Sequence, residues 1–561
     1  MTHEPNRTQS QRPAWHAVAP ATHWMNDPNG LWRDDDGLWH LWFQYRDDPP
    51  AYSRTHWGRL VSLDGLVWRY AGSDFAANVD SDIYSGCVVN VDDAVQRAYV
   101  TRHRHGRSSV AGSVLQPVGQ TVESWQRDGR HAAWRAAPPE SRVDPGLRDF
   151  RDPFVFRYGN SWRMLVAEPC PWDAAAPGPA RSRLQIWRSG DGLHWEPAGA
   201  IGPWDPPRVM WEVPQLLPLS ALQTLQAPAS GLAPKAGDLW VLLVSVLDRR
   251  AGRSGNDGTD IGCSVRWHLG TFDGARFDPV VNDASSASSL SRAADTSPVS
   301  TGAKEHRRTL SGRLLDQGPD FYAACLQTPG LAIPNEPILV AWMSHWAYAR
   351  RLPLPGFAGG PMTLPRRLTW VDHASGNGIR QQPLAALAHA RCSDPLVTPM
   401  QALSSVPCTV ARVLGSLDLE IHLHMAPSGQ AWMRLAEPGP PPPDGGTAKV
   451  PLALHIDALA HRVTLHRAPL SNPDPDHDPD SAPAPAPGFA GVWSAAWMPA
   501  ESGEVAVRLL LDGCCAEIFV DSGTVVFSAL VFLPADAVCT LSAEPDTPVQ
   551  LLAAQAWVVS V

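Results

Sequence analysis

Three carboxylic acid residues stand beside or near prolines in this sequence, and their side chains are suited to acid–base and nucleophilic chemistry. They are Asp27 in HWMNDPNG, Asp152 in FRDPFVF and Glu212 in MWEVPQL. Tight turns also select Asp, Asn, Pro and Gly, so NDPNG taken alone predicts a hairpin turn. Three carboxylates at matching positions of repeated units would be a costly cluster of like charges, which indicates a use beyond turn formation.

A pair of carboxyl groups is what the hydrolysis of glycosides requires. One stays ionised and attacks or stabilises an oxocarbenium-like centre, while the other protonates the leaving oxygen. Glu212 has apolar neighbours in the sequence, among them Trp211, which would disfavour its charged form. Asp27 has amide donors at hand in Asn26 and Asn29 and is expected to stay ionised more easily.

The elements that must position these residues are short strands separated by many turns, with almost no helical periodicity. Similar units of about four strands recur, and they close with signals such as SLDGLVW at 62–68 and SGDGLHW at 189–195. Repeated units of this kind predict propeller blades, because each blade buries its faces only against its neighbours. We count five such units, whose innermost strands would bring the three carboxylates to one central channel.

The predicted fold class is therefore all-β, with an N-terminal five-bladed β-propeller followed by a C-terminal β-sandwich. The boundaries expected from composition are a tail at 1–14, the propeller at 15–375, a linker at 376–394 and the sandwich at 395–561. A Ser- and Ala-rich stretch at 281–306 predicts a flexible insertion within the propeller.

Charge and composition exclude several classes of partner. A formal net charge of -10 argues against nucleic acid and anionic membranes as general partners. No apolar run is long enough to span a bilayer and the N-terminal stretch lacks a signal-peptide core, which predicts a cytoplasmic protein. Nine cysteines without a CxxC pair indicate neither a disulfide framework nor a zinc site. We expect no cofactor and no metal, and the sequence does not indicate an oligomeric state.

The ordered motifs HWMNDPNG, FRDPFVF and WEVPQL resemble the signatures of glycoside hydrolase family 32, the invertase, levanase and inulinase group. Further similar segments are FQY at 43–45, HWG at 56–58, YSG at 84–86, DFYA at 320–323 and LDGCCAEIFVDSG at 511–523. The resemblance implies an exo-acting β-fructofuranosidase of sucrose or fructans. It also implies a double displacement with retention of configuration through a covalent fructosyl intermediate.

Residue roles follow from the same resemblance. It implies that Asp27 is the nucleophile, Glu212 the acid/base and Asp152 a stabiliser that binds fructose hydroxyls. Substrate-binding residues are implied at Asn26, Gln44, Trp57, Ser85, Arg151 and Trp342. Where the family commonly has Cys after the acid/base this chain has Val213, and other departures fall on the leaving-group side. The sequence therefore does not rank sucrose, inulin and levan.

Other functions stay open at this stage. Transfer of fructose to another sugar would use the same residues, and a non-catalytic fructan-binding propeller would use the same channel. An inverting five-bladed arabinan hydrolase would not require NDPNG together with a C-terminal sandwich.

Overall fold

The computed structural model describes most of the 561 residues. The described ranges are 12–20, 23–34, 36–47, 54–75, 81–92, 95–118, 133–136, 139–147, 149–170, 181–223, 238–249, 262–280, 312–328, 336–354, 357–371, 378–413, 415–438, 450–470, 486 and 488–560. The insertion expected at 281–306 lies outside them.

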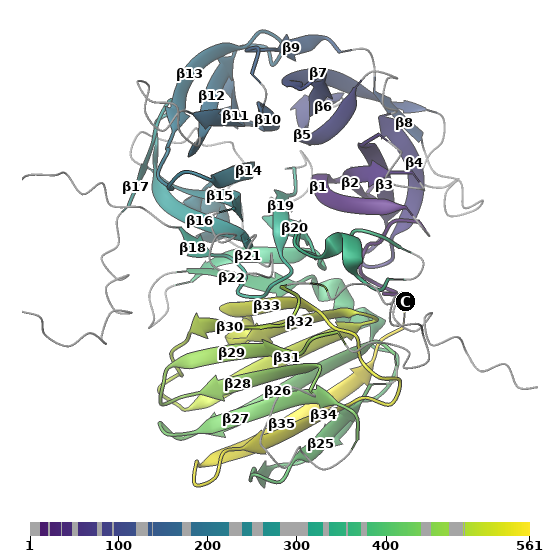
Figure 1. The fold of residues 1–561 in the computed structure, drawn as a ribbon, viewed down its shortest axis with the longest axis vertical. Coiled ribbons are helices and arrows are strands. Elements are labelled where there is room, and N and C mark those ends of the chain that lie inside the picture. Colours follow the sequence, from purple (N-terminus) through teal and green to yellow (C-terminus); the bar gives the residue numbers. More distant parts are fainter. Residues whose placement is uncertain are drawn as a thin grey trace, which may run out of the picture.

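The N-terminal part consists of five antiparallel sheets arranged around a common axis (Figure 1). The first sheet is β1 (Trp24–Arg33), β2 (Trp39–Arg46), β3 (His56–Ser62) and β4 (Arg69–Phe75). The second is β5 (Asp82–Asp92), β6 (Val95–Arg104), β7 (Arg107–Val118) and β8 (Ala133–Ala136), with β9 (Ser141–Val143) paired to β7. The third is β10 (Arg151–Tyr158), β11 (Ser161–Cys170), β12 (Arg181–Ser189) and β13 (Glu196–Ile201).

Two further sheets complete the ring. The fourth is β14 (Val209–Pro218), β15 (Leu239–Asp248), β16 (Gly262–Phe272) and β17 (Phe277–Pro279), with β18 (Arg313–Leu314) paired to β16. The fifth is β19 (Tyr322–Leu326), β20 (Ile338–Trp342), β21 (Arg366–Val371) and β22 (Gly378–Pro383). The inner strands β1, β5, β10, β14 and β19 each contact the next, and β19 contacts β1. The five-bladed propeller predicted from the repeats is confirmed.

The repeated Asp-Gly signal closes the blades by a specific hydrogen-bond pattern. In the turn from β3 to β4, Oδ1 of Asp64 accepts the backbone N–H groups of Leu66 and Val67 at 2.8 and 2.9 Å. Asp191 and Asp273 cap the corresponding turns of the third and fourth blades in the same way. In these three blades an aspartate therefore substitutes for a ladder partner where the outer strand begins.

Every inner strand has a bulge. Register shifts occur at Met25/Pro28, Tyr84/Gly86, Arg151/Phe154, Glu212/Gln215 and Tyr322/Cys325. Pro28, Pro153 and Pro214 lie at three of these bulges, where the missing proline N–H costs no ladder bond. NDPNG is thus a bulged segment inside β1 and not the hairpin turn that its composition predicts. A bulge re-aims the neighbouring side chains, which explains why carboxylates and prolines occur together.

The C-terminal part is a two-sheet sandwich (Figure 1). One sheet runs β23 (Leu396–Thr398), β35 (Val549–Val558), β26 (Leu417–Met425), β31 (Glu504–Asp512), β32 (Cys515–Val520) and β33 (Val525–Leu530), with β24 (Gln401–Ala402) also on β35. The other runs β25 (Cys408–Arg412), β34 (Val538–Ala543), β27 (Gln430–Ala436), β28 (Leu452–Asp457), β29 (Arg462–Arg467) and β30 (Gly491–Ala496). The alternate apolar residues of β26 enter the shared core, as period-two patterning requires.

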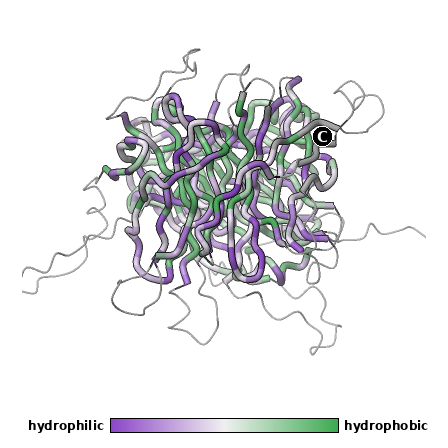
Figure 2. Tube along the Cα trace, turned by 90° about the horizontal axis from the view of Figure 1, so that it is seen from above, coloured by the Kyte–Doolittle hydropathy of each residue, from purple (hydrophilic) through white to green (hydrophobic). Residues whose placement is uncertain are grey.

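Helices are few and short in the described residues: α2 (Leu219–Gln223) and the 3-10 turns η4 (Ala349–Arg351), η5 (Ala385–Ala390) and η6 (Asp521–Gly523). None of the helices there is long and apolar enough to cross a bilayer. Hydrophobic segments concentrate in the interior, with hydrophilic ones toward the periphery (Figure 2).

The expected linker at 376–394 begins too early. Its first part forms β22, the outer strand of the fifth blade, and only η5 and its neighbours connect the blade to the sandwich. The sequence of this strand, GIRQQP, contains a single large apolar residue, because one face of an outer strand needs no apolar cover.

Candidate active site

Asp27 lies in the bulge of β1 with its carboxylate held from two blades. Asn26 Nδ2 donates to Asp27 Oδ1 at 3.0 Å, and Ser85 of β5 donates to Oδ2 at 2.7 Å. Gln44 of β2 donates to the same Oδ2 at 3.3 Å and to the Ser85 hydroxyl at 2.6 Å. The Trp24 indole N–H donates to Asn26 Oδ1 at 2.8 Å, which fixes the orientation of the Asn26 amide. The structure thus brings four predicted site residues into one network.

Burial acts against the charge of Asp27. Its pKa is raised, first by burial and further by the nearby Glu212 carboxylate, although the hydrogen bonds from Asn26 and Ser85 lower it. The expectation of an easily ionised Asp27 is therefore only partly met. Asn26 donates as expected, but the buried amide of Asn29 has no hydrogen-bond partner among the described residues.

Asp152 occupies the bulge of β10 with a left-handed backbone, φ 62°. Its N–H donates to Thr101 Oγ1 at 2.8 Å, and its Oδ2 accepts the N–H of Val213 at 3.1 Å. Burial raises the pKa of Asp152 to about 7, while the Arg151 guanidinium lowers it. The side chain is 5% exposed. A carboxyl group of this kind can donate or accept a hydrogen bond near neutral pH.

Both carboxylate oxygens of Glu212 accept hydrogen bonds, one from a guanidinium group and one from a phenol hydroxyl. Arg151 Nη2 donates to its Oε1 at 2.6 Å, and the hydroxyl of Tyr322 on β19 donates to its Oε2. Trp211 and Val213, the apolar sequence neighbours, are buried in the blade on either side, whereas the Glu212 carboxylate keeps 15% exposure. Sequence neighbours point away because side chains alternate along a strand, so the expected apolar environment of this carboxylate is wrong.

Two groups around Glu212 stay in one protonation state at ordinary pH. Burial, followed by the Glu212 charge, raises the pKa of Tyr322 well above its usual value, so its hydroxyl remains a donor. Burial alone would lower the pKa of Arg151, but the carboxylates of Glu212 and Asp152 raise it. Arg151 Nε lies 3.9 Å from Asp152 Oδ2, so one guanidinium faces both carboxylates.

The two tryptophans predicted as substrate-binding residues lie in the packing around the channel. Trp57 is 0% exposed, joins the core between the first and second blades, and donates its indole N–H to the Tyr84 carbonyl at 3.0 Å. Trp342 is also 0% exposed, within the core shared by the first and fifth blades. Neither ring offers an exposed face to a ligand, so both are placed as supports of the site.

Tyr322 is the main site residue that sequence reasoning missed. It belongs to the DFYA segment and stands at the bulge of the fifth inner strand, the place where the first, third and fourth blades carry their carboxylates. Position in the repeat was therefore a usable signal. Thr101, whose hydroxyl donates to the Ser85 carbonyl at 2.7 Å and accepts from Asp152, gave no such signal.

The assembled site has the components for acid–base and nucleophilic catalysis at one carbon. Asp27, Asp152 and Glu212 come from three different blades. The Glu212 charge raises the pKa of both Asp27 and Asp152, which shows that the three carboxyl groups lie close together. Within the described part of the chain, no group of three or more His, Cys, Asp and Glu side chains is arranged to hold a metal ion.

Family models match both parts of the chain. The model of the glycosyl hydrolases family 32 N-terminal domain matches residues 16–383, and the model of the family 32 C-terminal region matches residues 453–557. The chain belongs to glycoside hydrolase family 32. It is thus a glycoside hydrolase, and its propeller and sandwich are the two parts of the family 32 fold.

Individual relatives of this family 32 chain are distant. An extracellular exo-inulinase of Aspergillus ficuum is 24% identical over 564 residues, covering 96% of this chain and 92% of the relative. A levanase of Bacillus subtilis is 26% identical over 388 residues, covering 68% of this chain and 48% of the relative. The solved fructofuranosidase from Schwanniomyces occidentalis complexed with fructosylnystose has a TM-score of 0.68 at 17% identity and covers 99% of each chain.

The predicted cytoplasmic location is wrong. The exo-inulinases that match along nearly the whole chain are named as extracellular, which overturns a location inferred from the N-terminal residues alone. Cysteine usage does not decide the compartment either, because all nine thiols are unpaired and most are buried. Cys514 and Cys515 pack in the core at the sandwich side of the interface, as their apolar strand pattern predicts.

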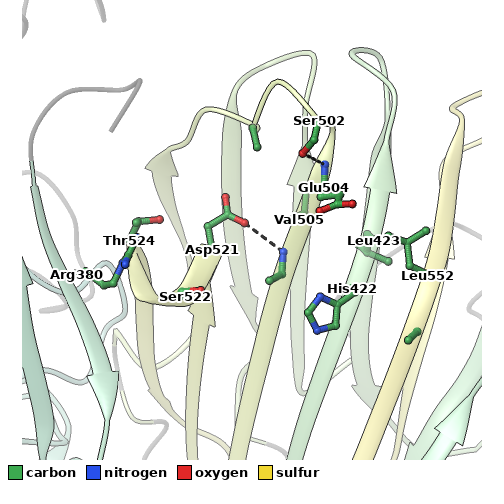
Figure 3. A pocket seen from close by; sticks show the side chains of 13 residues that line it. Arg380, His422, Leu423, Ser502, Glu504, Val505, Asp521, Ser522, Thr524 and Leu552 are labelled. Carbon is green, nitrogen blue, oxygen red and sulfur yellow. Dashed lines mark hydrogen bonds between the residues drawn. The ribbon is translucent and has the colours of Figure 1, made fainter. Parts of the chain in front are cut away.

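A groove lies apart from the carboxylate cluster, between the fifth blade and the sandwich. Figure 3 shows Arg380 beside Thr524 on one side and His422 and Glu504 on the other. None of the three candidate catalytic carboxylates lines it. The groove is consequently not part of the site described above.

Proposed function

We propose that this family 32 chain is a retaining, exo-acting β-fructofuranosidase that removes terminal fructosyl units from sucrose or fructans. The observation that carries the proposal is the pairing of Asp27 and Glu212 across one channel, each with its own set of donors. Relatives named exo-inulinase, levanase and fructofuranosidase support a fructoside as the substrate. The oligosaccharide in the last of these supports a channel that accepts more than a disaccharide.

In the first step, a carboxylate oxygen of Asp27 forms a bond to the anomeric carbon of the terminal fructose. The bond from that carbon to the glycosidic oxygen breaks, and its electron pair stays on the leaving oxygen. The carboxylic acid form of Glu212 gives its proton to that oxygen, so the leaving sugar departs neutral. Ser85 and Asn26 hold the Asp27 carboxylate in one orientation, which favours attack by positioning.

In the second step, the Glu212 carboxylate takes a proton from water. The water oxygen bonds to the anomeric carbon, and the bond to Asp27 breaks to regenerate its carboxylate. Tyr322 and Arg151 then donate to the Glu212 oxygens and stabilise the charged form of the base. Two inversions at one carbon leave the configuration unchanged, and the pair of carboxyls must lie about 5–5.5 Å apart for this route.

We assign Asp152 to the sugar hydroxyls and not to the scissile bond. Its Oδ2 already accepts the Val213 N–H, and its other oxygen, which accepts no hydrogen bond from the described residues, would bind vicinal hydroxyls of the fructose ring. Hydrogen bonds of this kind strengthen as positive charge develops on the ring in the transition state. Gln44, which contacts both Asp27 and Ser85, completes the polar side of the fructose subsite.

The proposal is tested by product analysis of the wild-type protein with sucrose, inulin and levan, together with Asp27→Asn and Glu212→Gln. We expect free fructose, formed initially as the β-anomer, and a loss of several orders of magnitude in both variants. Asp144→Asn is the matched control, since Asp144 lies in an exposed loop near Arg142 and its replacement should leave the rate unchanged. Fructose appearing mainly on other sugars would indicate transfer in place of hydrolysis. Binding without any product would overturn the proposal.

A further inference from the structure

A buried arginine of the sandwich contacts two residues of the fifth-blade region of the propeller, Asp320 and Tyr348. Arg467, the last residue of β29, has a fully buried side chain. Its Nη1 donates to Asp320 Oδ2 at 2.5 Å and to the Leu530 carbonyl at 3.1 Å. Its Nη2 donates to the Tyr348 hydroxyl at 2.9 Å, and its Nε to the Phe489 carbonyl at 2.7 Å. All three guanidinium nitrogens thus donate hydrogen bonds, and their acceptors belong to both the propeller and the sandwich.

Asp320 ties the propeller to the free edge of the sandwich sheet. β33 is the last strand of its sheet, and Asp320 pairs with it through a backbone N–H to the Ser528 carbonyl at 3.1 Å. The Leu530 N–H donates to Asp320 Oδ2 at 2.7 Å, and the Tyr348 hydroxyl donates to Oδ1. Both carboxylate oxygens therefore have donors, and Arg467 balances the charge.

The anchor Asp320 lies only two positions before Tyr322, which belongs to the candidate catalytic machinery. Asp320 immediately precedes Phe321 and Tyr322, and the bulge of β19 follows at Ala323 with φ 50°. Tyr322 then donates its hydroxyl hydrogen bond to Glu212. Because a bulged strand aims its side chains according to where its ends are held, the position of the Tyr322 hydroxyl depends on the anchor at Asp320.

We propose that Arg467 is a positioning residue for the acid/base. It fixes Asp320 and Tyr348, and so holds Tyr322 against Glu212. This inference rests on the role proposed above for Glu212. It makes the sandwich a working part of the active site, in addition to a support for the propeller.

The choice of arginine points to geometry and not only to stability. A fully buried ion pair adds little net stability compared with well-packed apolar residues, since both ions lose their hydration. What the planar guanidinium adds is a fixed fork of donors that places several acceptors at once. Lysine would keep the charge that balances Asp320, but it would not hold Tyr348 and the two carbonyls in the same arrangement.

The consequence for catalysis appears in the pH profile. Loosening Tyr322 changes the hydrogen bonding of the acid/base itself, so it should alter the pH profile of activity, which a loss of general structural support would not do. The other titratable or charged groups that influence Glu212 remain in place in an Arg467 variant; they are Arg151, Asp27, Asp152 and Cys263.

The test is a double-mutant cycle of Arg467→Lys with Tyr322→Phe in the full-length protein. Initial rates on sucrose are measured from pH 4 to 9, giving kcat and KM for the wild type, both single variants and the double variant. Arg391→Lys is the matched control. Arg391 is another arginine, in the segment that follows η5; it contacts Asp418 and Glu420 of the sandwich strand β26, and none of its contacts among the described residues is with β19. Arg467→Met removes both the charge and the hydrogen-bond donors, so its kinetics are interpreted only in comparison with those of Arg467→Lys.

We expect Arg467→Lys to lower kcat about tenfold with KM changed less than about twofold, and to alter the pH profile of activity. In the Tyr322→Phe background the same substitution should change kcat by less than about twofold, because the link it acts through is gone. Arg391→Lys should leave kcat and the pH profile as in the wild type.

Equal effects of Arg467→Lys in both backgrounds, or an unchanged kcat and pH profile, would overturn the inference. These outcomes are distinct from a failure of the proposed function, in which the wild type releases no fructose or Glu212→Gln retains full activity.

Discussion

The hydroxyl of Ser85 donates a 2.7 Å hydrogen bond to Oδ2 of Asp27, so that the second blade orients a carboxylate carried by the first. The Ser85 hydroxyl also receives the amide of Gln44, which places Ser85 at the centre of the network. A carboxylate that must attack one carbon depends on such orientation, since small displacements of reacting atoms cost large factors in rate.

Ser85→Ala should therefore lower kcat/KM on sucrose by about 10- to 100-fold without unfolding the protein. Ser73→Ala is the matched control, because Ser73 also donates to an oxygen, the Trp57 carbonyl at 2.9 Å, but from the outer strand β4 of the first blade. Steady-state kinetics and thermal melting of both variants check the prediction. Similar losses of activity in the two would show that the site is not specifically sensitive to Ser85.

The roles of the two main carboxyls can be separated by the leaving group. Glu212→Gln cannot protonate the departing oxygen, so its defect should shrink by about 10²-fold or more on an aryl fructoside whose phenol leaves readily without a proton. Asp27→Asn lacks the nucleophile and should be equally inactive on sucrose and on the aryl fructoside. Comparing the two variants on both substrates is the measurement. If Glu212→Gln loses the same factor in activity on sucrose and on the aryl fructoside, the assignment of Glu212 as the acid is contradicted.

The sequence predicts the blades and the carboxylates for a shared physical reason. Prolines are tolerated in an inner strand only at a bulge, and a bulge is where a side chain is turned into the channel. Asp27, Asp152 and Glu212 all stand beside or near such prolines. Tyr322 has no proline next to it, so only its place in the fifth repeat could have revealed it.

Contacts across blades and across the two parts of the chain could not be predicted in this way. Tyr322 meets Glu212 across 110 positions of sequence, and Arg467 meets Asp320 across 147. Periodicity tells which face of a strand is apolar, but not which partner lies opposite it. The same ambiguity explains Trp57 on β3 and Trp342 on β20, because a large ring on a blade strand can face a ligand or the neighbouring blade. The structure places both in the packing.

Asp152 should make the folded protein less stable at alkaline pH. Burial raises its folded pKa to about 7, above the ordinary value of 3.8, so the folded state binds more protons than the unfolded state between those values. The free energy of unfolding therefore falls as pH rises from about 4 to 7 and stays lower above it. Asp152→Asn should melt several degrees higher than the wild type at pH 8 but not at pH 4, while its activity falls. Melting temperatures at both pH values check this, and a variant that is destabilised at pH 8 would contradict it.

A second pH dependence of stability arises in the segment that precedes the first blade. There a raised pKa is caused by charged partners and not by burial. His16 is buried between Asp512 and Glu517, with its Nδ1 and Nε2 at 2.9 and 3.0 Å from their oxygens. Burial alone would lower its pKa, but the two carboxylates raise it to about 9. The neighbouring N–H groups of Trp15 and His16 also donate to Asp512, so this contact holds the N-terminal segment on the sandwich.

The sign follows from linkage. A histidine whose folded pKa lies above its unfolded value of 6.5 contributes stability that is fully present below pH 6.5 and is lost as pH rises through about 9. Asp152 is half titrated at about pH 7 and contributes little further change above about pH 8. The remaining histidines with a resolved shift have lowered pKa values and titrate at lower pH; these are His40, His56, His268, His345, His455 and His466. His16 therefore contributes a decline between pH 7 and 9 that these other groups do not, while buried thiols of raised pKa, such as Cys87 and Cys325, add a decline of their own as pH nears the ordinary cysteine value of 9.

His16→Gln should lower the melting temperature at pH 6.5 and flatten its decline between pH 7 and 9, because the variant has no proton to lose there. His389→Gln is the control, since His389 is exposed on η5 and its replacement should leave the wild-type decline intact. The melting temperatures of the three proteins at pH 6.5, 7.5 and 9 decide the matter. If His16→Gln declines in parallel with the wild type, another group is responsible and the charged state of His16 does not hold the N-terminal segment in place.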